Sequence, residues 1–329
     1  MFVAAPQKTG RQRPTIIPVA AGKGGVGKSM LTANLAIALS ELELNTIAVD
    51  LDLGSSNLHH FFGIRNQHPG VGDFLKARQG VLSDYVLPFG GASLGFIPGD
   101  GKSPFMANIY HAQKIKLINH ILKLDADVVL LDLGGGAAFN TLDFFAIGER
   151  GILVTVPEYP AIVGMLGFLK QHLLRIIARS AAGHRPVHLL LHKIFKNAMD
   201  QQVPSLVDLC RQIEAEDPRM ASQVRAVYRQ CRPRIVFNRG RAPEDAMIAE
   251  KISRSLKQIL DIEADYFGFI HEDRSVASSV KQQVPLSLHD PSCRAAEDVR
   301  RIALRVKNYW SMDIPDSAQR IYKQLAVQT

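Results

Sequence analysis

The chain has 329 residues, of which 47% are hydrophobic and 21% are charged, and its formal net charge is +8. These values exclude an intrinsically disordered chain and are typical of a globular protein with one large core, with or without an elaboration. The N-terminus lacks the apolar stretch of a secretory signal, and there is no run of about 18 apolar residues. We therefore expect a cytoplasmic protein without a membrane-spanning helix.

The excess positive charge lies in the second half of the chain. Residues 1–160 contain 13 Lys+Arg and 13 Asp+Glu, whereas residues 161–329 contain 26 and 18. This asymmetry favours contact with an acidic protein, an anionic lipid surface or nucleic acid, and a solvated basic face is the alternative. Three isolated cysteines, Cys210, Cys231 and Cys293, argue against a disulfide framework and against a zinc or iron–sulfur site.

The first predicted elements surround a glycine-rich loop. Residues 1–14 are basic and interrupted by Pro and Gly, which indicates a flexible arm. Thr15–Ala20 is an apolar, β-branched run that predicts a strand, and Met30–Leu42 has apolar residues at helical spacing. Residues 22–29 between them read GKGGVGKS and match the pattern G-x-x-x-x-G-K-[ST]. Strand, loop and helix follow in the order of a phosphate-binding P-loop.

This loop supplies the groups that bind a nucleoside triphosphate with Mg²⁺. Lys28 would reach the outer phosphates, and the Ser29 hydroxyl would ligate Mg²⁺. The backbone N–H groups that would surround the phosphates belong to Gly24, Gly25, Val26 and Gly27. A dinucleotide-binding fingerprint also fits the glycines, but Lys28 and Ser29 directly after the last glycine favour a triphosphate. A plain glycine-rich turn is the remaining alternative.

The rest of the chain alternates between strand and helix patterns. Further strands are predicted near Thr46–Asp50, Leu94–Pro98, Val128–Asp132, Gly151–Val156, Arg234–Asn238 and Asp265–Ile270. Several are continuous apolar runs, as expected of strands that are covered on both faces. The pattern predicts an α/β fold with a doubly wound, mostly parallel sheet of about seven or eight strands flanked by helices. Ligands bind such sheets at the carboxyl ends of the strands.

One segment breaks this alternation. About fifty residues, roughly 183–232, read as polar helices and exceed the length of a crossover connection. We interpret them as a helical insertion in a P-loop domain that covers residues 15–311, followed by a tail at 312–329. Within the insertion, His184, His188 and His192 share a helical spacing, but Pro186 interrupts the run and no carboxylate completes a metal site.

Two strand ends carry carboxylates. Asp50 and Asp52 end the second strand, two residues apart and therefore on one side of it, and Asp132 ends an apolar strand in the manner of a Walker B element. Carboxylates near a phosphate tail hold Mg²⁺ through its water shell and orient an attacking water. The sequence therefore predicts Ser29, Asp50 and Asp132 as metal-site residues and Asp52 as the water-orienting residue. A turn or capping pair is the alternative for the two aspartates.

These residues resemble the MinD/ParA family of deviant Walker A P-loop ATPases, whose hallmark K-G-G-x-G-K-[ST] matches residues 23–29. The resemblance continues through residues 50–57, Asp132, residues 155–158 and residues 270–273, and it covers most of residues 15–307 outside the insertion. It is closest to the MinD and FlhG-like branch. The resemblance implies a SIMIBI-like P-loop fold, ATP and Mg²⁺ as cofactors, and a homodimer in the ATP-bound state.

The resemblance also implies roles for single residues. Lys23 would reach the phosphates in the partner subunit and would act in catalysis together with Lys28 and Asp52, while Asn238 would contact the adenine. Met30 occupies the α-phosphate-contacting position, where Thr or Ser is common. The flagellar relatives carry an N-terminal Asp-Gln-Ala motif that this chain lacks. The tail has only two cations, Arg320 and Lys323, which favours a packing helix over a membrane-binding one.

The function implied is a slowly hydrolysing ATP-dependent dimerisation switch that positions a cellular structure, in cell division, at a flagellum or pole, or on a chromosome. A nucleotide-sensing adaptor with a vestigial ATPase and a ParA-type DNA-partitioning ATPase are the alternatives. We expect a protein partner at the insertion or at the basic C-terminal half. The inner face of the membrane is a further candidate surface, and nucleic acid is less favoured.

Overall fold

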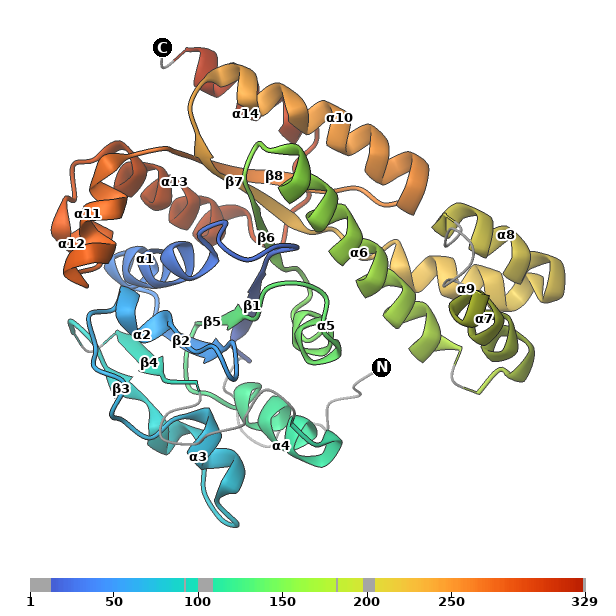
Figure 1. Ribbon diagram of the computed structural model, residues 1–329, viewed down its shortest axis with the longest axis horizontal. Coiled ribbons are helices and arrows are strands. Elements are labelled where there is room, and N and C mark those ends of the chain that lie inside the picture. Colours follow the sequence, from blue (N-terminus) through green and yellow to red (C-terminus); the bar gives the residue numbers. More distant parts are fainter. Residues whose placement is uncertain (1–12, 92, 100–108, 182, 198–204, 328–329) are drawn as a thin grey trace.

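The computed structural model describes residues 13–91, 93–99, 109–181, 183–197 and 205–327, without the side chains of residues 193–197. Most of the predicted N-terminal arm lies outside this range. The described part forms an α/β sandwich around one central sheet (Figure 1).

The sheet has eight strands among the described residues, in the order β3-β4-β2-β5-β1-β6-β7-β8. Their bounds are β1 Thr15–Ala20, β2 Thr46–Leu51, β3 Leu87–Pro88, β4 Leu94–Ile97, β5 Val128–Leu133, β6 Ile152–Thr155, β7 Arg234–Gly240 and β8 Asp265–His271. The predicted doubly wound parallel sheet is confirmed. The exception is β3, a two-residue strand that pairs antiparallel with β4 at the edge and was not predicted. Its proline, which has no backbone N–H to donate, is tolerated there because one side of an edge strand faces solvent and needs no partner strand.

Helices cover both faces of the sheet (Figure 1). The helices are α1 Lys28–Glu41, α2 Leu58–Phe61, α3 Val71–Lys76, α4 His111–Ile121, α5 Phe139–Phe145, α6 Tyr159–Ser180, α7 Arg185–Asn197, α8 Leu206–Glu216, α9 Pro218–Tyr228, α10 Ile248–Ser255, α11 Arg274–Gln282, α12 Leu286–His289, α13 Arg294–Tyr309 and α14 Ser317–Ala326, with short turns η1 Leu82–Tyr85, η2 Pro243–Met247 and η3 Leu256–Leu260. Successive strand residues face opposite cores, so Ile17 and Val19 pack with α1 and α13, whereas Ile16 and Ala20 face α4 to α6.

Helix α6 is the one described helix whose length and composition alone would allow it to cross a bilayer, and the sequence analysis did not single it out. Half of the apolar stretch of this helix is buried inside the fold. Met165, Phe168 and Leu169 are among the side chains that pack into the core. The apolar character of α6 is therefore used in packing against the sheet.

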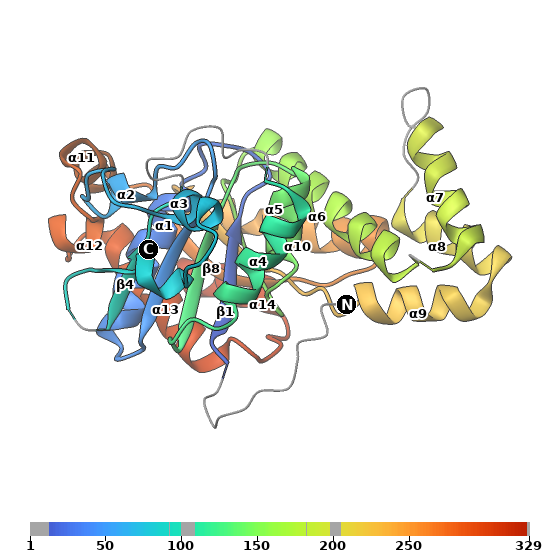
Figure 2. The same cartoon turned by 90° about the horizontal axis from the view of Figure 1, so that it is seen from below.

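Three helices, α7 to α9, follow α6 and extend beyond the sheet (Figure 2). They lie within the predicted insertion, although the interpretation of Pro186 was wrong. Pro186 is the second residue of α7, where its missing N–H would have no partner in the helix, so it does not interrupt the helix.

Tyr228 is almost fully buried, and its hydroxyl lies 3.3 Å from Asp261 at the end of η3. The neighbouring Arg229 pairs with the same carboxylate. The division into domain, insertion and tail stays a prediction.

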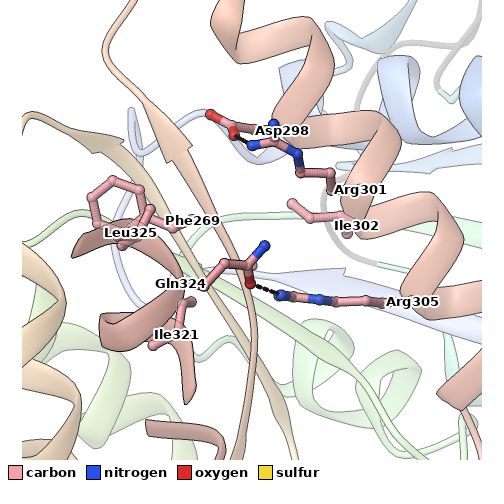
Figure 3. Close-up of a pocket in the computed structure, with 9 residues that line it drawn as sticks. Phe269, Asp298, Arg301, Ile302, Arg305, Ile321, Gln324 and Leu325 are labelled. Carbon is pink, nitrogen blue, oxygen red and sulfur yellow. Dashed lines mark hydrogen bonds and ion pairs between the residues drawn. The ribbon is translucent and has the colours of Figure 1, made fainter. Parts of the chain in front are cut away.

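The C-terminal helix α14 packs onto β8, α10 and η2, and it faces α13 across a small cavity (Figure 3). Ile321 and Leu325 are buried, and Arg305 of α13 donates hydrogen bonds to Gln324 and to the carbonyl oxygen of Phe267. The cavity left between them has a volume of only about 20 Å³, enough for about one water molecule. The apolar face of α14 is therefore occupied by the core.

His172 on α6 makes stability depend on pH. Its ring stacks on Phe168 and meets Phe145 edge-on, and burial lowers the pKa of His172 to about 4 from 6.5. Between these pH values the unfolded chain binds a proton that the folded chain does not, so the stabilisation present above pH 6.5 is lost as the pH falls towards 4.

Replacing His172 with phenylalanine should remove this part of the pH dependence. We expect the wild type to lose about 2 kcal/mol more than His172→Phe between pH 7 and pH 5, measured as the free energy of unfolding in urea. The exposed His111 serves as control, and His111→Gln should follow the wild type. Parallel pH curves for wild type and His172→Phe would contradict the burial argument.

Candidate nucleotide-binding site

The P-loop connects β1 to α1 at the carboxyl edge of the sheet. Gly25 and Gly27 have φ angles of 80° and 90°, which glycine adopts without strain. A Cβ atom added to Gly24 or Gly25 would meet nothing within 4 Å. The front of the loop therefore offers open backbone directly before the N-terminus of α1, which is the geometry of an anion site.

The back of the loop is packed against the protein. The side-chain amide of Asn238, at the end of β7, donates to the carbonyl oxygen of Val26 at 2.8 Å and accepts from the N–H of Arg239 at 3.0 Å. Arg239 has a φ of 58° and donates to the carbonyl oxygen of Gly25 at 3.3 Å. Because these carbonyl groups are held from behind, the N–H groups of the loop are left for a ligand in front.

Gly22 allows the loop to touch α6. A Cβ atom on Gly22 would lie 2.1 Å from the backbone of Gly164, a contact that only a backbone shift could relieve. We therefore expect Gly22→Ala to destabilise the fold by about 2 kcal/mol or more. Gly24→Ala, at an open position nearby, should leave stability within about 0.5 kcal/mol. Thermal unfolding of the two variants gives the comparison, and equal melting temperatures would contradict the close contact of loop and helix.

Lys28, Ser29 and Asp132 meet behind the loop, as the predicted Walker elements require. Lys28 Nζ lies 2.9 Å from Asp132 Oδ1, and Ser29 Oγ donates to Asp132 Oδ2 at 2.7 Å. A third donor, the hydroxyl of Thr32, lies 2.9 Å from Asp132 Oδ1. All four side chains are buried.

Asp50 lies beside Asp132 because β2 and β5 are neighbours and the two residues are partners in the ladder. Its carboxylate accepts hydrogen bonds from the Ser56 hydroxyl at 2.6 Å and from the N–H groups of Leu58 and Asp52 at 3.0 Å. Burial and the Asp132 charge raise the pKa of Asp50 to about 7. The donors show that Asp50 organises the loop 52–58; its predicted place in the metal site stays a prediction.

Asp52 faces the loop that follows β5. A Cβ atom on Gly134 would lie 3.2 Å from Asp52 Oδ1, and one on Gly135 would lie 3.4 Å from the backbone of Gly24. The N–H of Gly136 donates to the carbonyl oxygen of Ala21 at 3.0 Å. Asp52, the Gly134–Gly136 loop and the P-loop therefore meet at one edge of the sheet.

The remaining predicted residues take different positions. Lys23 is exposed. Met30 is only 3% exposed, so its thioether packs into the core beside the loop. Asn238 is bound to the P-loop, and its adenine contact stays a prediction.

The residues present fit Mg²⁺ and a triphosphate. The hard oxygen donors of Ser29 and Asp132 suit Mg²⁺, and the open backbone with Lys28 suits phosphate. Asn57, in the loop that Asp50 organises, also has a buried side-chain oxygen without a hydrogen-bond partner in the described structure. Such an oxygen is available to a ligand or its water shell.

A family model described as the CobQ/CobB/MinD/ParA nucleotide binding domain matches residues 17–286. The chain belongs to this family. Its P-loop is thus that of a nucleotide-binding domain, and the resemblance to MinD/ParA ATPases is confirmed.

Several curated relatives agree with this membership. The chain is 22% identical to the antiactivator FleN of Pseudomonas aeruginosa over 297 residues, 89% of this chain and 86% of FleN. It is 28% identical to the septum site-determining protein MinD of Helicobacter pylori over 144 residues, and 28% identical to the flagellum site-determining protein YlxH of that organism over 189 residues. Those two matches cover 44% and 55% of this chain, and 53% of MinD and 63% of YlxH.

Solved structures of the family share the fold. MinD of Pyrococcus horikoshii, solved with Mg-ADP, superposes with a TM-score of 0.58 at 20% identity and covers 91% of this chain and 98% of its own. The MinC:MinD complex of Aquifex aeolicus gives a TM-score of 0.57 at 20% identity, with 92% and 98% covered.

Three residues near the site were not predicted from the sequence: Thr32, Ser56 and Arg239. Thr32 had a usable signal, because it is a polar residue one turn after Ser29 in a mostly apolar stretch of the helix. Ser56 and Arg239 had none, since serines and exposed arginines occur at many positions of a chain without touching a site. Their contacts depend on how separate strands come together.

Proposed function

We propose that the protein is a Mg²⁺-dependent ATPase that dimerises when ATP is bound and positions a cellular structure according to its nucleotide state. The observation that carries this proposal is the contact of Lys28, Ser29 and Asp132 behind an open P-loop. The names of FleN, YlxH and MinD support a positioning role, in flagellar or septum placement.

The site residues divide the work of hydrolysis. Mg²⁺, held by Ser29 and Asp132, would neutralise phosphate charge. Lys28 holds the outer phosphates, and Asp52 orients the attacking water at the edge formed with Gly134. Asp50 fixes the loop that carries Asp52.

Lys23 supports a homodimer in which each subunit completes the site of the other. Its side chain is exposed on the loop, so in our proposal its ammonium group reaches the phosphates of the opposite subunit. Light scattering with ATP should give dimers for the wild type, whereas Lys23→Ala should bind ATP but stay largely monomeric. Lys123→Ala changes an exposed lysine just after α4 and should behave as the wild type. Dimers of Lys23→Ala at wild-type strength would contradict this role.

A nucleotide-sensing adaptor is the second candidate, and the buried Met30 favours it. Thr or Ser at that position would offer a hydroxyl to the α-phosphate, which methionine cannot do. An adaptor would bind ATP but release phosphate at the background rate under every condition.

Phosphate release separates these candidates. The rate of phosphate release is to be measured for the protein alone, with vesicles of anionic lipid, and with duplex DNA at several salt concentrations. Turnover that Asp52→Asn abolishes supports the switch, background turnover throughout supports the adaptor, and salt-sensitive stimulation by DNA supports a DNA-partitioning ATPase. We propose a cytoplasmic location with peripheral association at the inner membrane face, which stimulation by vesicles would support.

A further inference from the structure

Thr32 is a fully buried residue of α1, one turn beyond Ser29, to which the proposed function assigns no role. A buried hydroxyl requires hydrogen-bond partners. Thr32 Oγ1 lies 3.0 Å from the carbonyl oxygen of Lys28 and 2.9 Å from Asp132 Oδ1. The first contact is the usual one of a helical threonine with the carbonyl group four residues earlier. The second joins residues 100 positions apart and is specific to this fold. The hydroxyl has one proton to donate, and the charged carboxylate is the stronger of the two acceptors, so we assign the proton to Asp132 Oδ1.

Lys28 and Thr32 share one oxygen of Asp132. Both contact Oδ1, at 2.9 Å each, whereas Ser29 contacts Oδ2. In the proposed function Lys28 binds the outer phosphates, so its ammonium group turns away from Asp132 when a triphosphate enters. Thr32 is then the remaining donor to Oδ1 among the residues that the structure describes.

The orientation of Asp132 needs such a donor. Its carboxylate is fully buried and is the ladder partner of a second buried carboxylate, Asp50. Asp50 is held by three donors from its own loop, so it cannot turn away from Asp132 easily. If Oδ1 lost its donors, repulsion and the cost of an unpaired buried oxygen would rotate the Asp132 carboxylate, and Oδ2 would leave Ser29.

We propose that Thr32 is a positioning residue that anchors Asp132 Oδ1, so that Oδ2 stays directed at Ser29 and at the Mg²⁺ ion these two residues would hold. The inference rests on the proposed function and adds Thr32 to the residues that set how much Mg²⁺ the protein needs to bind ATP tightly. A hydrogen bond to a charged group is stronger than one between neutral groups. Loss of the hydrogen bond between Thr32 and Asp132 should therefore weaken the affinity for Mg²⁺ by a measurable amount.

Calorimetry of ATP binding tests this role without relying on hydrolysis. ATP affinity is measured in EDTA and over a series of Mg²⁺ concentrations for the wild type, Thr32→Val and Thr32→Ser. Thr32→Val should need about ten-fold more Mg²⁺ for half-maximal tightening of ATP binding, with an affinity in EDTA within about two-fold of wild type. Thr32→Ser keeps the hydroxyl and should restore the wild-type response.

The control is Thr46→Val, which removes another fully buried threonine hydroxyl, bonded to the carbonyl oxygen of Leu44 at the opposite end of β2. It should leave the Mg²⁺ response unchanged. A wild-type response in Thr32→Val, or an equal loss in Thr32→Val and Thr32→Ser, would overturn the inference. Should Thr32→Val not fold, Thr32→Ala makes the same comparison. A wild type that binds no ATP would instead overturn the proposed function itself.

Discussion

Replacing Asp52 with asparagine is expected to slow ATP hydrolysis about 100-fold or more, while ATP affinity stays within a few-fold of wild type. Asp52 lies at the edge where the P-loop meets Gly134, half-buried, so its carboxylate can accept a hydrogen bond from water near the outer phosphate. Asparagine has nearly the same shape but lacks the charge that orients and polarises this water. Steady-state phosphate release gives the rate, and fluorescence of a labelled ATP analogue gives the affinity.

Asp84 provides the control for this variant. It is an exposed aspartate in η1, and Asp84→Asn should hydrolyse ATP at the wild-type rate. Unchanged turnover in Asp52→Asn would remove Asp52 from the reaction. Lost ATP binding would show that its charge acts on the ground state instead.

The second large effect concerns stability, at the edge of the sheet opposite the P-loop. Asp265 at the start of β8 is fully buried and accepts two hydrogen bonds of 2.9 Å from Arg232. It also pairs with Arg234, which is itself fully buried. Asp265→Asn leaves Arg234 without its buried countercharge, so the free energy of unfolding should fall by about 3–5 kcal/mol.

Glu263 gives a matched control, because it pairs with the same Arg232 at 2.7 Å but its side chain is 59% exposed. Exposed pairs contribute little, so Glu263→Gln should change stability by less than about 1 kcal/mol. Urea unfolding of both variants checks the contrast. Similar losses in both, or no loss in Asp265→Asn, would show that burial does not set the strength of this network.

Local patterns predicted the fold and part of the site because their causes are local. The strand before the P-loop, its glycines and the following helix occupy 27 consecutive residues, 15–41, and each is specified by its own sequence. The carboxylates at the ends of β2 and β5 were predicted as members of one site from a general property of parallel sheets. That the two carboxylates are direct neighbours could not be predicted, because it depends on the order of the strands in the sheet, which local sequence patterns do not reveal.

The features that were missed depend on distant residues. Thr32 reaches Asp132 only because α1 packs over β5, and Arg239 reaches Gly25 only because β7 ends behind the P-loop. The antiparallel β3 has two residues, too few for a periodic pattern. Pro186 was taken as an interruption because its position relative to the start of α7 could not be known from spacing alone.

Calorimetry of the wild type and Lys28→Ala tests most directly whether Mg²⁺ and ATP bind at the P-loop. We predict about one ATP bound per wild-type chain in the presence of Mg²⁺, and at least about 100-fold weaker binding to folded Lys28→Ala, whose circular dichroism should match the wild type. No heat of ATP binding to the folded wild type, or equal binding to both proteins, would contradict the claim.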